Sequence, residues 1–351
     1  MKSFMRKSLS FLLSAISLTS VCRSYFAEVN SEPVGTAGGF SENFEWSIDD
    51  EGVLTIRGEG NMPSYEDGLG MERPWEKYNF TTLIIGDGVK SIGANSFSEC
   101  KSLSTVIMAD SVETVDSSAF SNCTNLESVK TSENLHTIFN YAFCGCKKLK
   151  NIPVGDSVIV IMKHAFDETL WLENQGEGVV YAGNVTYCFK GSYPSVIRIR
   201  KGTTAIADKA FTSGKTKTFI LPEGVSYIGE EAFYASAIKS INIPSSVNNI
   251  GYDAFAMTFS PKIYGYRGTY AEKHCDNFIP IDFLIGDLDK NNTINIEDAT
   301  ILQRCFADYI YFAFDIIKNN LLADVNYDGV ADINDVTEIQ KILAGFDSEK
   351  N

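Results

Sequence analysis

The sequence predicts a solenoid rich in short parallel β-strands, followed by a small all-α module with two calcium loops. Two observations indicate this fold class: a phenylalanine that returns at a nearly constant interval, and an acidic loop pattern that occurs twice near the C-terminus. A repeated unit of this size forms one coil that buries its apolar face against its neighbours. The repeated phenylalanines are Phe97, Phe120, Phe143, Phe166, Phe211, Phe233 and Phe255.

Each repeat carries apolar residues at fixed distances before its phenylalanine. The steps between phenylalanines are 23, 23, 23, 45, 22 and 22 residues, and alanine precedes all but the first, where Ser96 stands. An aliphatic residue lies five positions before each phenylalanine, and a short alternating run such as Val106/Met108 lies twelve and fourteen positions before it. This pattern predicts one short strand per coil, stacked in parallel on its neighbour, then a turn and a second apolar segment that closes the coil.

The ends of the repeat and its long step are predicted to differ from the regular coils. Residues 44–75 alternate apolar and polar side chains between glycines, which is typical of hairpins. A solenoid must cover the open end of its core, so residues 28–80 are predicted to form an N-terminal β cap. The repeats then occupy residues 81–283, with an insertion near 170–200 and a C-terminal cap, and the helical module occupies residues 284–351.

The cysteines and histidines suggest no catalytic or metal site within the repeats. Cys100, Cys123 and Cys146 each follow the repeat phenylalanine by three residues, so they are equivalent positions on successive coils and predict a ladder of small buried side chains rather than disulfides. The three histidines occupy unrelated phases of the repeat, and no common catalytic motif occurs. Carboxylate pairs of the glycosidase kind are not excluded by sequence.

The inserted segment contains tyrosines that have two interpretations. Tyr181, Tyr187 and Tyr193 either stack on sugar rings or a partner protein, or form the apolar face of an inserted hairpin. The second interpretation is favoured.

Two stretches near the C-terminus have the oxygen spacing of a calcium loop. Side chains with oxygen atoms fall at loop positions 1, 3, 5, 9 and 12 of both stretches, and the second has Gly329 at position 6, where the first has Asn292. The flanking residues are also matched at the same offset of 37, which makes chance duplication improbable. The predicted side-chain ligands are Asp287, Asp289, Asn291, Asn295 and Asp298 in the first loop, and Asp324, Asn326, Asp328, Asp332 and Asp335 in the second.

Charge and the first residues indicate an exported protein. The 351-residue chain has a formal net charge of -15, which argues against nucleic acid or anionic lipid as a partner. Residues 1–27 combine a basic start, an apolar run and a polar stretch, as in a secretory signal peptide, and the apolar run is too short for a membrane span. The chain is therefore expected to be secreted, without an integral membrane segment.

The repeats resemble the bacterial leucine-rich repeats of the BspA type. Residues 112–126 and 225–233 carry most openly the motif Ser-Val-x-x-Ile-Gly-x-x-Ala-Phe-x-x-Cys-x-x-Leu, and the resemblance covers roughly residues 40–283. It implies a leucine-rich-repeat solenoid without the outer helices of the common horseshoe. The same resemblance covers two local stretches: residues 171–183 in the insertion, and residues 263–272, for which it implies a closing strand and a short helix.

The C-terminal module resembles a type I dockerin. Position 12 of both loops is aspartate, and a helical run follows each loop (residues 299–307 and 336–344) without a good entering helix, unlike an ordinary EF-hand. The resemblance implies two Ca²⁺ ions, with the carbonyls of Thr293 and Val330 as further ligands, and docking onto a cohesin domain of a scaffoldin in a cellulosome-type complex. The positions that it implies for partner binding are Ile296, Glu297, Gln303, Arg304, Ile333, Asn334, Gln340 and Lys341.

These expectations combine into a secreted, non-catalytic protein that is docked by its calcium module and presents a repeat surface for protein or glycan binding. Two alternatives remain open at this point: a polysaccharide-degrading glycoside hydrolase, and a passive structural spacer. The ligand of the repeats and the cohesin specificity class are not predicted by the sequence.

Overall fold

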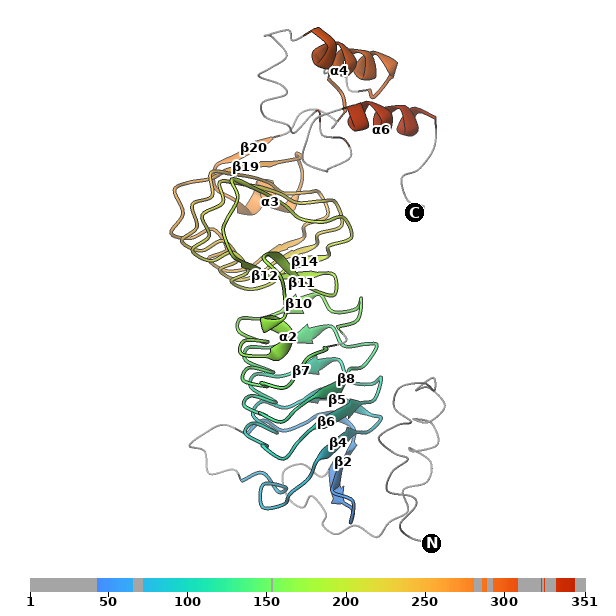
Figure 1. Cartoon of the computed structure of the whole chain (residues 1–351), viewed down its shortest axis with the longest axis vertical. Helices are drawn as coiled ribbons and strands as arrows, with labels where there is room; N and C mark the ends of the chain where they lie inside the picture. The colour runs from blue at the N-terminus through green and yellow to red at the C-terminus, as the bar shows by residue number, and fades with distance from the viewer. Residues whose placement is uncertain are drawn as a thin grey trace.

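The computed structural model describes residues 43–65, 72–152, 154–280, 286–288, 293–308, 323, 325 and 333–344. The predicted signal peptide lies outside these residues. The described repeats form a β-solenoid in which short strands stack coil upon coil (Figure 1). The parallel strands predicted from the repeat are confirmed, and the strands gather into four five-stranded sheets.

Two sheets line the N-terminal half of the solenoid. The first has the order β1-β2-β4-β6-β8, and only its β1–β2 hairpin is antiparallel. Its strands are β1 Phe44–Ile48, β2 Val53–Gly58, β4 Thr82–Ile85, β6 Thr105–Met108 and β8 Ser128–Lys130. The second has the order β10-β9-β7-β5-β3 and is parallel throughout. Its strands are β3 Gly60–Asn61, β5 Val89–Ile92, β7 Thr114–Val115, β9 Thr137–Ile138 and β10 Val160–Ile161.

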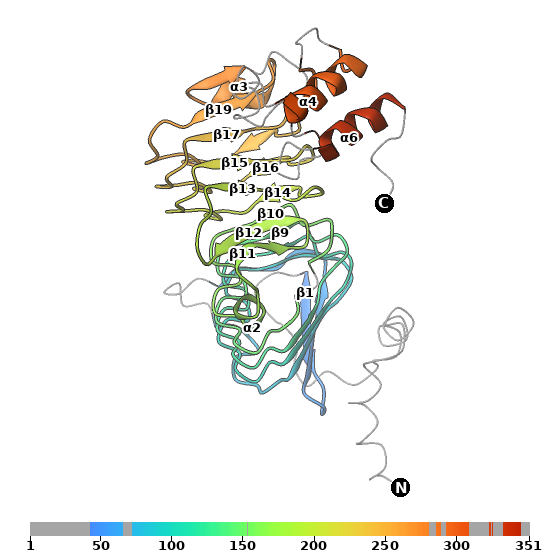
Figure 2. The ribbon, with the colours of Figure 1, turned by 45° about the horizontal axis from the view of Figure 1, so that its top comes forward.

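Two further sheets line the C-terminal half, which Figure 2 shows with its strands in successive steps. The third sheet, β11-β12-β14-β16-β18, starts with an antiparallel hairpin, and the fourth, β13-β15-β17-β19-β20, is parallel. The third contains β11 Gly178–Ala182, β12 Val185–Lys190, β14 Ala205–Ile206, β16 Tyr227–Ile228 and β18 Asn249–Ile250. The fourth contains β13 Val196–Arg198, β15 Thr218–Ile220, β17 Ser240–Asn242, β19 Lys262–Gly265 and β20 Phe278–Pro280. Helix α2 (Leu170–Glu173) precedes the β11–β12 hairpin, and helix α3 (Tyr270–His274) lies between β19 and β20.

The coils differ from the sequence prediction in one respect. One strand per coil was expected, but the second apolar segment also forms a strand, usually of two residues, such as β7 or β16. Its β-branched or aromatic residue pairs with the equivalent residue of the next coil, as Thr114 pairs with Thr137. Two residues are too few for an alternating pattern to become visible, so the periodicity could not reveal these strands.

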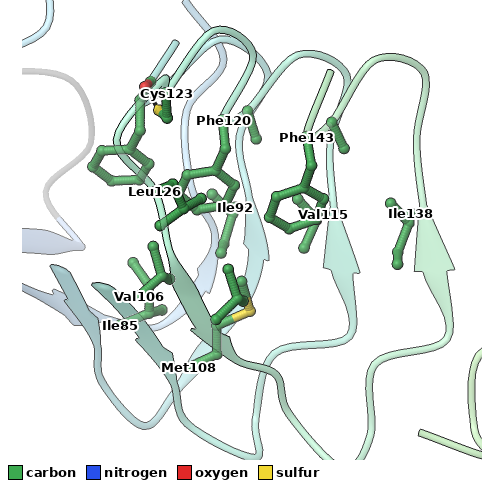
Figure 3. Close-up of a cluster of buried hydrophobic side chains, with 14 of the residues drawn as sticks. Ile85, Ile92, Val106, Met108, Val115, Phe120, Cys123, Leu126, Ile138 and Phe143 are labelled. Atoms are coloured by element: carbon green, nitrogen blue, oxygen red, sulfur yellow. Dashed lines mark hydrogen bonds between the residues drawn. The ribbon is translucent and has the colours of Figure 1, made fainter. Parts of the chain in front are cut away.

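The repeat phenylalanines form the centre of the core. Phe97, Phe120 and Phe143 are fully buried, and successive rings stack with centroids 5.5 and 5.3 Å apart and planes within 11°. Figure 3 shows Phe120 and Phe143 pointing into the interior, with side chains from both strands of the coils around them. This stack runs from Trp75 to Phe166, and a second one joins Phe211, Phe233 and Phe255.

The long step in the repeat separates two core clusters. The insertion fills this junction with α2 and the β11–β12 hairpin, and the ring of Tyr187 packs against Phe166 at 5.4 Å. The Lys190 ammonium donates to the carbonyl oxygens of Leu172, Glu173 and Gln175 at 2.9, 3.1 and 2.6 Å. Lys190 therefore ties the end of α2 to the hairpin through three backbone carbonyls at the end of the helix, of which that of Leu172 also accepts from the Gln175 N–H.

The glycine of the Ile-Gly pairs faces the backbone of the preceding coil. A Cβ atom on Gly229 would lie 2.5 Å from the Asp208 nitrogen and 2.6 Å from the Ala207 carbonyl carbon. Backbone atoms of a buried coil cannot move aside as a flexible side chain can, so only glycine fits here.

Replacing Gly229 with alanine is expected to destabilise the C-terminal half of the solenoid by about 3 kcal/mol, because the extra methyl group overpacks a rigid site. Urea unfolding followed by circular dichroism measures this loss. Gly176→Ala is the matched control, since a Cβ at Gly176 meets no atom within 4 Å. Equal stability of the two variants would contradict the packing argument.

Candidate functional site

The C-terminal module contains two described helices, α4 (Ile296–Asp308) and α6 (Ile333–Leu343). They share a small apolar core, and both views show them next to each other (Figures 1 and 2). The core residues are Leu288, Ala299, Leu302, Ala323, Val325, Val336 and Ile339, with Ile294 and Ile301 packed against them. The duplicated sequence thus forms two helices that bury equivalent faces against each other.

Both helices begin three residues earlier than the sequence predicts. The side-chain oxygen of Asn295 accepts a hydrogen bond from the Glu297 N–H at 2.6 Å, and the Asp298 carboxylate accepts one from the Asn295 N–H at 2.8 Å. These bonds satisfy amide donors at the start of α4, as an N-terminal cap does. The loop residues Asn295 and Asp298 therefore also start the helix.

The described calcium-loop carboxylates are fully buried. Asp287, Asp298 and Asp335 each have no exposed surface, although their module is small. The Asp298 carboxylate also accepts a hydrogen bond from the Leu288 N–H at 2.6 Å, so it bridges the beginning and the end of the first loop. Buried carboxylates are costly unless hydrogen bonds or a cation compensate them.

The chemistry of this donor set fits a hard cation such as Ca²⁺, because Asp287, Thr293, Asn295, Asp298 and Asp335 offer only oxygen atoms as side-chain ligands. The other predicted ligands lie outside the described residues: Asp289, Asn291, Asp324, Asn326, Asp328, Val330 and Asp332. Among the described residues alone, no group of three or more metal-binding side chains is close enough to hold an ion. The two calcium ions therefore stay a prediction.

All eight predicted partner-binding positions are exposed. Ile296 is 60 % exposed and Ile333 is 59 % exposed, and these residues occupy equivalent positions at the start of α4 and α6. Because Ile296 and Ile333 are separated by the same 37 residues as the two loops, the exposed apolar side chain is duplicated together with the sequence. The polar partner positions Glu297, Gln303, Arg304, Asn334, Gln340 and Lys341 are exposed as well.

The cysteines of the repeats belong to the core, as predicted. Cys123 and Cys146 are buried, and their thiols donate to the carbonyl oxygens of Phe97 and Phe120 at 3.0 and 3.1 Å. Cys100 is partly buried, and burial raises the pKa of its thiol to about 12. The cysteines that the structure describes are free thiols. A buried thiol with a raised pKa is a poor nucleophile, so these residues are structural.

The tyrosines of the insertion pack against the protein, which confirms the favoured interpretation. Tyr187 is 4 % exposed, and its hydroxyl accepts from the Phe166 N–H and donates to the Asp167 carboxylate, both at 3.0 Å. The rings of the other two tyrosines also contact neighbouring side chains. Tyr181 packs under the Arg200 guanidinium at 4.0 Å, and Tyr193 stacks on Phe189 at 4.3 Å.

The histidines have unrelated surroundings, as expected. His164 lies 2.7 Å from Asp167, whose carboxylate also binds the Tyr187 hydroxyl. His136 contacts Thr137, and His274 stacks on Tyr270. His136 also lies 3.9 Å from the Glu113 carboxylate, whereas the pair of His164 and Asp167 belongs to the bonds that close the junction between the two core clusters.

Sequence reasoning missed a buried carboxylate at this junction. Asp208 is 6 % exposed, its N–H donates to the Ile161 carbonyl, and its carboxylate accepts from the Glu230 N–H at 2.8 Å. Burial, and to a lesser degree the Glu230 carboxylate, raises the pKa of Asp208 to about 6, although Tyr227 and Lys163 oppose the shift. Its position one residue after the aliphatic-alanine pair of a coil gave no sequence signal.

The raised pKa of Asp208 predicts a pH-dependent stability. The native state binds this proton more tightly than the unfolded state, so the contribution of Asp208 is most favourable at low pH and is lost as the pH rises from about 4 through 6. Asp208→Asn should remove that loss, so its melting temperature should rise relative to wild type between pH 4 and pH 7. Thermal unfolding at several pH values measures this difference. The exposed Asp87→Asn is the control, and a difference that does not change with pH would refute the linkage.

Stacked coils with two parallel strands each, around a ladder of buried phenylalanines, define a leucine-rich-repeat β-solenoid. The chain belongs to the family of the BspA type leucine rich repeat region, whose model matches in six copies over residues 74–175 and 185–264, more than half of the chain. The matched residues end before the helix pair of α4 and α6. The family resemblance seen in the repeat motif is therefore confirmed.

Solved structures of other bacterial repeat proteins are similar to this chain. A leucine-rich repeat protein from Eubacterium ventriosum is 22 % identical, with 64 % of this chain and 71 % of that chain covered and a TM-score of 0.30. One from Bacteroides ovatus is 18 % identical, with 65 % and 71 % covered and a TM-score of 0.28. A leucine rich cell surface protein from Faecalibacterium prausnitzii is 18 % identical, with 70 % and 98 % covered and a TM-score of 0.24. No curated protein matches the chain.

No helix in the described part of the chain is long and apolar enough to cross a membrane.

Proposed function

We propose that this chain is a secreted, non-catalytic binding protein that docks through its C-terminal module, in the manner of a type I dockerin, onto a cohesin domain of a scaffoldin. The solenoid then presents its surface to a protein partner. A repeat solenoid offers a wide, continuous surface, and its family consists of repeat proteins of this kind. The repeat cysteines and the insertion tyrosines, which might have formed a reactive or binding site, pack instead against the core or the junction.

One observation carries the docking proposal. Ile296 and Ile333 are exposed at equivalent positions of a duplicated loop and helix, while the other faces of the same helices share one core. An exposed apolar side chain on a rigid, capped helix start is an anchor for a partner pocket. Because both halves carry the same anchor, either half can meet the same partner.

A panel of cohesin domains tests this proposal in binding assays with the full chain, in calcium and in EDTA. We expect binding to at least one cohesin in calcium and none in EDTA. Ile296→Asp or Ile333→Asp alone should weaken binding only about twofold. Each variant removes one of two equivalent binding orientations, and the loss of one of two equal orientations halves the affinity. The double variant should weaken it at least about 30-fold, the effect of about 2 kcal/mol at an interface anchor.

The matched control is Ile342→Asp, which places the same charge at another exposed position of α6. It should bind as wild type. Absence of binding to every cohesin in calcium would refute the docking proposal. Release of sugar from a polysaccharide panel would favour the glycoside hydrolase alternative, and a solenoid that captures no protein would favour the spacer.

A further inference from the structure

The turns that carry the repeat phenylalanines are joined by a regular ladder of backbone hydrogen bonds. In each, three N–H groups at alternate residues donate to three carbonyl oxygens of the next coil. Thus Asn95, Phe97 and Glu99 donate to the carbonyls of Ser117, Ala119 and Ser121 at 3.0, 2.8 and 2.7 Å. In these turns the coils therefore present acceptors toward the N-terminal end of the solenoid and donors toward its C-terminal end, whereas bonds beside the strands run in the opposite direction, as from the Asp116 N–H to the Ile92 carbonyl.

The N-terminal end of this ladder is sealed. The first coil would expose the carbonyl oxygens of Ala94, Ser96 and Ser98. These accept, in order, from the Tyr65 N–H at 2.8 Å, the Trp75 indole N–H at 2.9 Å and the Arg73 guanidinium at 2.5 Å. The cap thus supplies a donor for each of the three acceptors.

At the junction inside the solenoid, a side chain again supplies the hydrogen-bond partner of the central backbone group. The N–H of Phe166, the central donor of the last coil before the insertion, donates to the Tyr187 hydroxyl at 3.0 Å. A side chain of the inserted hairpin therefore replaces the carbonyl of the missing coil.

The C-terminal end differs from both. In the last coil the corresponding donors are the N–H groups of Asp253, Phe255 and Met257, and no described residue accepts from them. The adjoining strand β18 is also the last strand of its sheet. On the other side of the same coil, β19, β20 and α3 continue and cover the fourth sheet. Helix α3 also contacts β18, so the opening lies within residues 249–259 in the turn that follows this strand.

The side chains of this open edge are the most exposed large apolar ones in the described part of the chain. Tyr252, Met257 and Phe259 are 77 %, 72 % and 90 % exposed. The ring of Phe255 stacks on Phe233 at 5.3 Å on one side, and as the last of its stack it has no further phenylalanine on the other. Unpaired backbone donors framed by exposed apolar side chains are a template for main-chain pairing with another chain.

We propose that residues 249–259 are a docking edge to which a segment of a partner protein adds as one further rung, in the turn conformation of the solenoid's own coils. The segment presents carbonyl oxygens at alternate residues to Asp253, Phe255 and Met257, and an apolar side chain to the exposed side chains of Tyr252, Met257 and Phe259. This inference rests on the binding role proposed for the solenoid and names its surface and the chemistry of its partner. It does not involve the calcium module.

The ladder also argues that the partner is not a second copy of this chain. Two C-terminal edges would bring donors against donors. A head-to-tail contact would require the acceptors of the first coil, which Tyr65, Trp75 and Arg73 already occupy. Neither end of a second copy therefore offers complementary carbonyl oxygens to this turn, so we assign them to a partner protein of another kind.

A peptide that copies residues 226–238 of this protein is a suitable probe. In the solenoid the carbonyls of Glu230, Ala232 and Tyr234 accept from the equivalent three donors of the preceding coil. Fluorescence anisotropy with the full-length chain measures its binding, and hydrogen-exchange mass spectrometry follows the amides of residues 249–259. We expect saturable binding and at least tenfold slower exchange in this segment, equally in calcium and in EDTA.

Variants separate this edge from the rest of the surface. A triple serine variant of Tyr252, Met257 and Phe259 should weaken peptide binding at least tenfold and leave the melting temperature unchanged, because these side chains are exposed. The control is the pair Tyr78→Ser and Tyr141→Ser, exposed apolar residues elsewhere on the solenoid, and it should bind as wild type.

Four results would overturn the proposal. The first is an absence of binding up to about 1 mM peptide, which corresponds to less than about 4 kcal/mol of affinity, and the second is unchanged amide exchange at saturation. The third is calcium-dependent binding, which would place the site on the helix pair. The fourth is self-association of the chain that the triple variant abolishes, which would make a second copy the occupant. None of them bears on cohesin docking, so the two proposals fail separately.

Discussion

Replacing Phe120 with alanine is expected to lower the free energy of unfolding of the solenoid by about 4 kcal/mol. The ring is fully buried and stacks on Phe97 and Phe143, with centroids 5.5 and 5.3 Å away. Truncation of a buried phenylalanine costs about 3–5 kcal/mol through lost burial and the cavity that remains, and two stacking contacts are lost in addition. Urea unfolding of the full chain, followed by circular dichroism and by tryptophan fluorescence, measures the effect, since Trp46, Trp75 and Trp171 all lie in the N-terminal core cluster.

The chain contains its own matched control for this prediction. Phe255 occupies the same repeat position but stacks on one side only, at Phe233, and is only partly buried. Phe255→Ala should therefore cost clearly less than Phe120→Ala. Equal costs at the two sites would mean that the stack contributes nothing beyond the burial of individual rings. A cost below about 1 kcal/mol at Phe120 would contradict the central role of the ladder.

Neighbouring coils should amplify the effect of Phe120→Ala. In a repeat array each coil is stabilised by its own contacts and by the interfaces to its two neighbours. Loss of the central ring weakens both interfaces of one coil, so the N-terminal core from β1 to β10 should unfold in two steps instead of one. The unfolding transition followed by tryptophan fluorescence would then separate from the transition followed by circular dichroism.

The solenoid could be predicted from sequence because each structural position of a coil, such as the core phenylalanine, returns at a fixed place in every repeat. The spacing of Phe97, Phe120 and Phe143 fixed the coil length, and the alternating run before each phenylalanine located strands such as β6. The Ile-Gly pairs were visible as a pattern, but their cause was not. Gly229 is required because the backbone of the preceding coil lies where its Cβ would be, and such proximity between coils is a property of the stacked structure.

Other features depend on contacts between distant residues and left no trace in the sequence pattern. Asp208 lies between two other coils: its N–H donates to the Ile161 carbonyl, and its carboxylate accepts from the Glu230 N–H. Lys190 is a structural lysine because α2 ends beside β12. The open donor row of Asp253, Phe255 and Met257 consists of backbone groups, which a pattern of side chains cannot show. The motif predicted what repeats, whereas these features arise where the repeat stops.

The helix pair was predicted less completely. Its two helices and their shared apolar face follow from the duplicated sequence, whereas their starts at Ile296 and Ile333 were placed three residues too late. The reason for α4 is that Asn295 and Asp298 were assigned to the loop alone, although they also bond to amides at the helix start. Most of the second loop lies outside the described residues, so the assignment of its ligands rests on sequence.

Removal of calcium is expected to abolish the fold of the C-terminal module, which is the largest effect predicted here. Asp287, Asp298 and Asp335 are fully buried in a module whose core consists of a few aliphatic side chains. A core of this size supplies little stability by itself, and buried carboxylates oppose folding unless a cation compensates them. We therefore expect metal binding and folding to be coupled, with calcium at a thousandfold excess over its dissociation constant contributing about 4 kcal/mol per site.

Circular dichroism at 222 nm of residues 284–351, titrated with calcium and then with EDTA, measures this coupling. We expect the helical signal to appear with calcium and to disappear with the chelator. Asp298→Ala should shift the calcium midpoint upward at least tenfold, because this carboxylate also closes the first loop through Leu288 and Asn295. Thr300→Ala is the control on the same helix, since Thr300 bonds only within α4 among the described residues. If the segment is equally helical with and without calcium, the calcium loops and the docking function built on them are both wrong, while the solenoid and its open edge are unaffected.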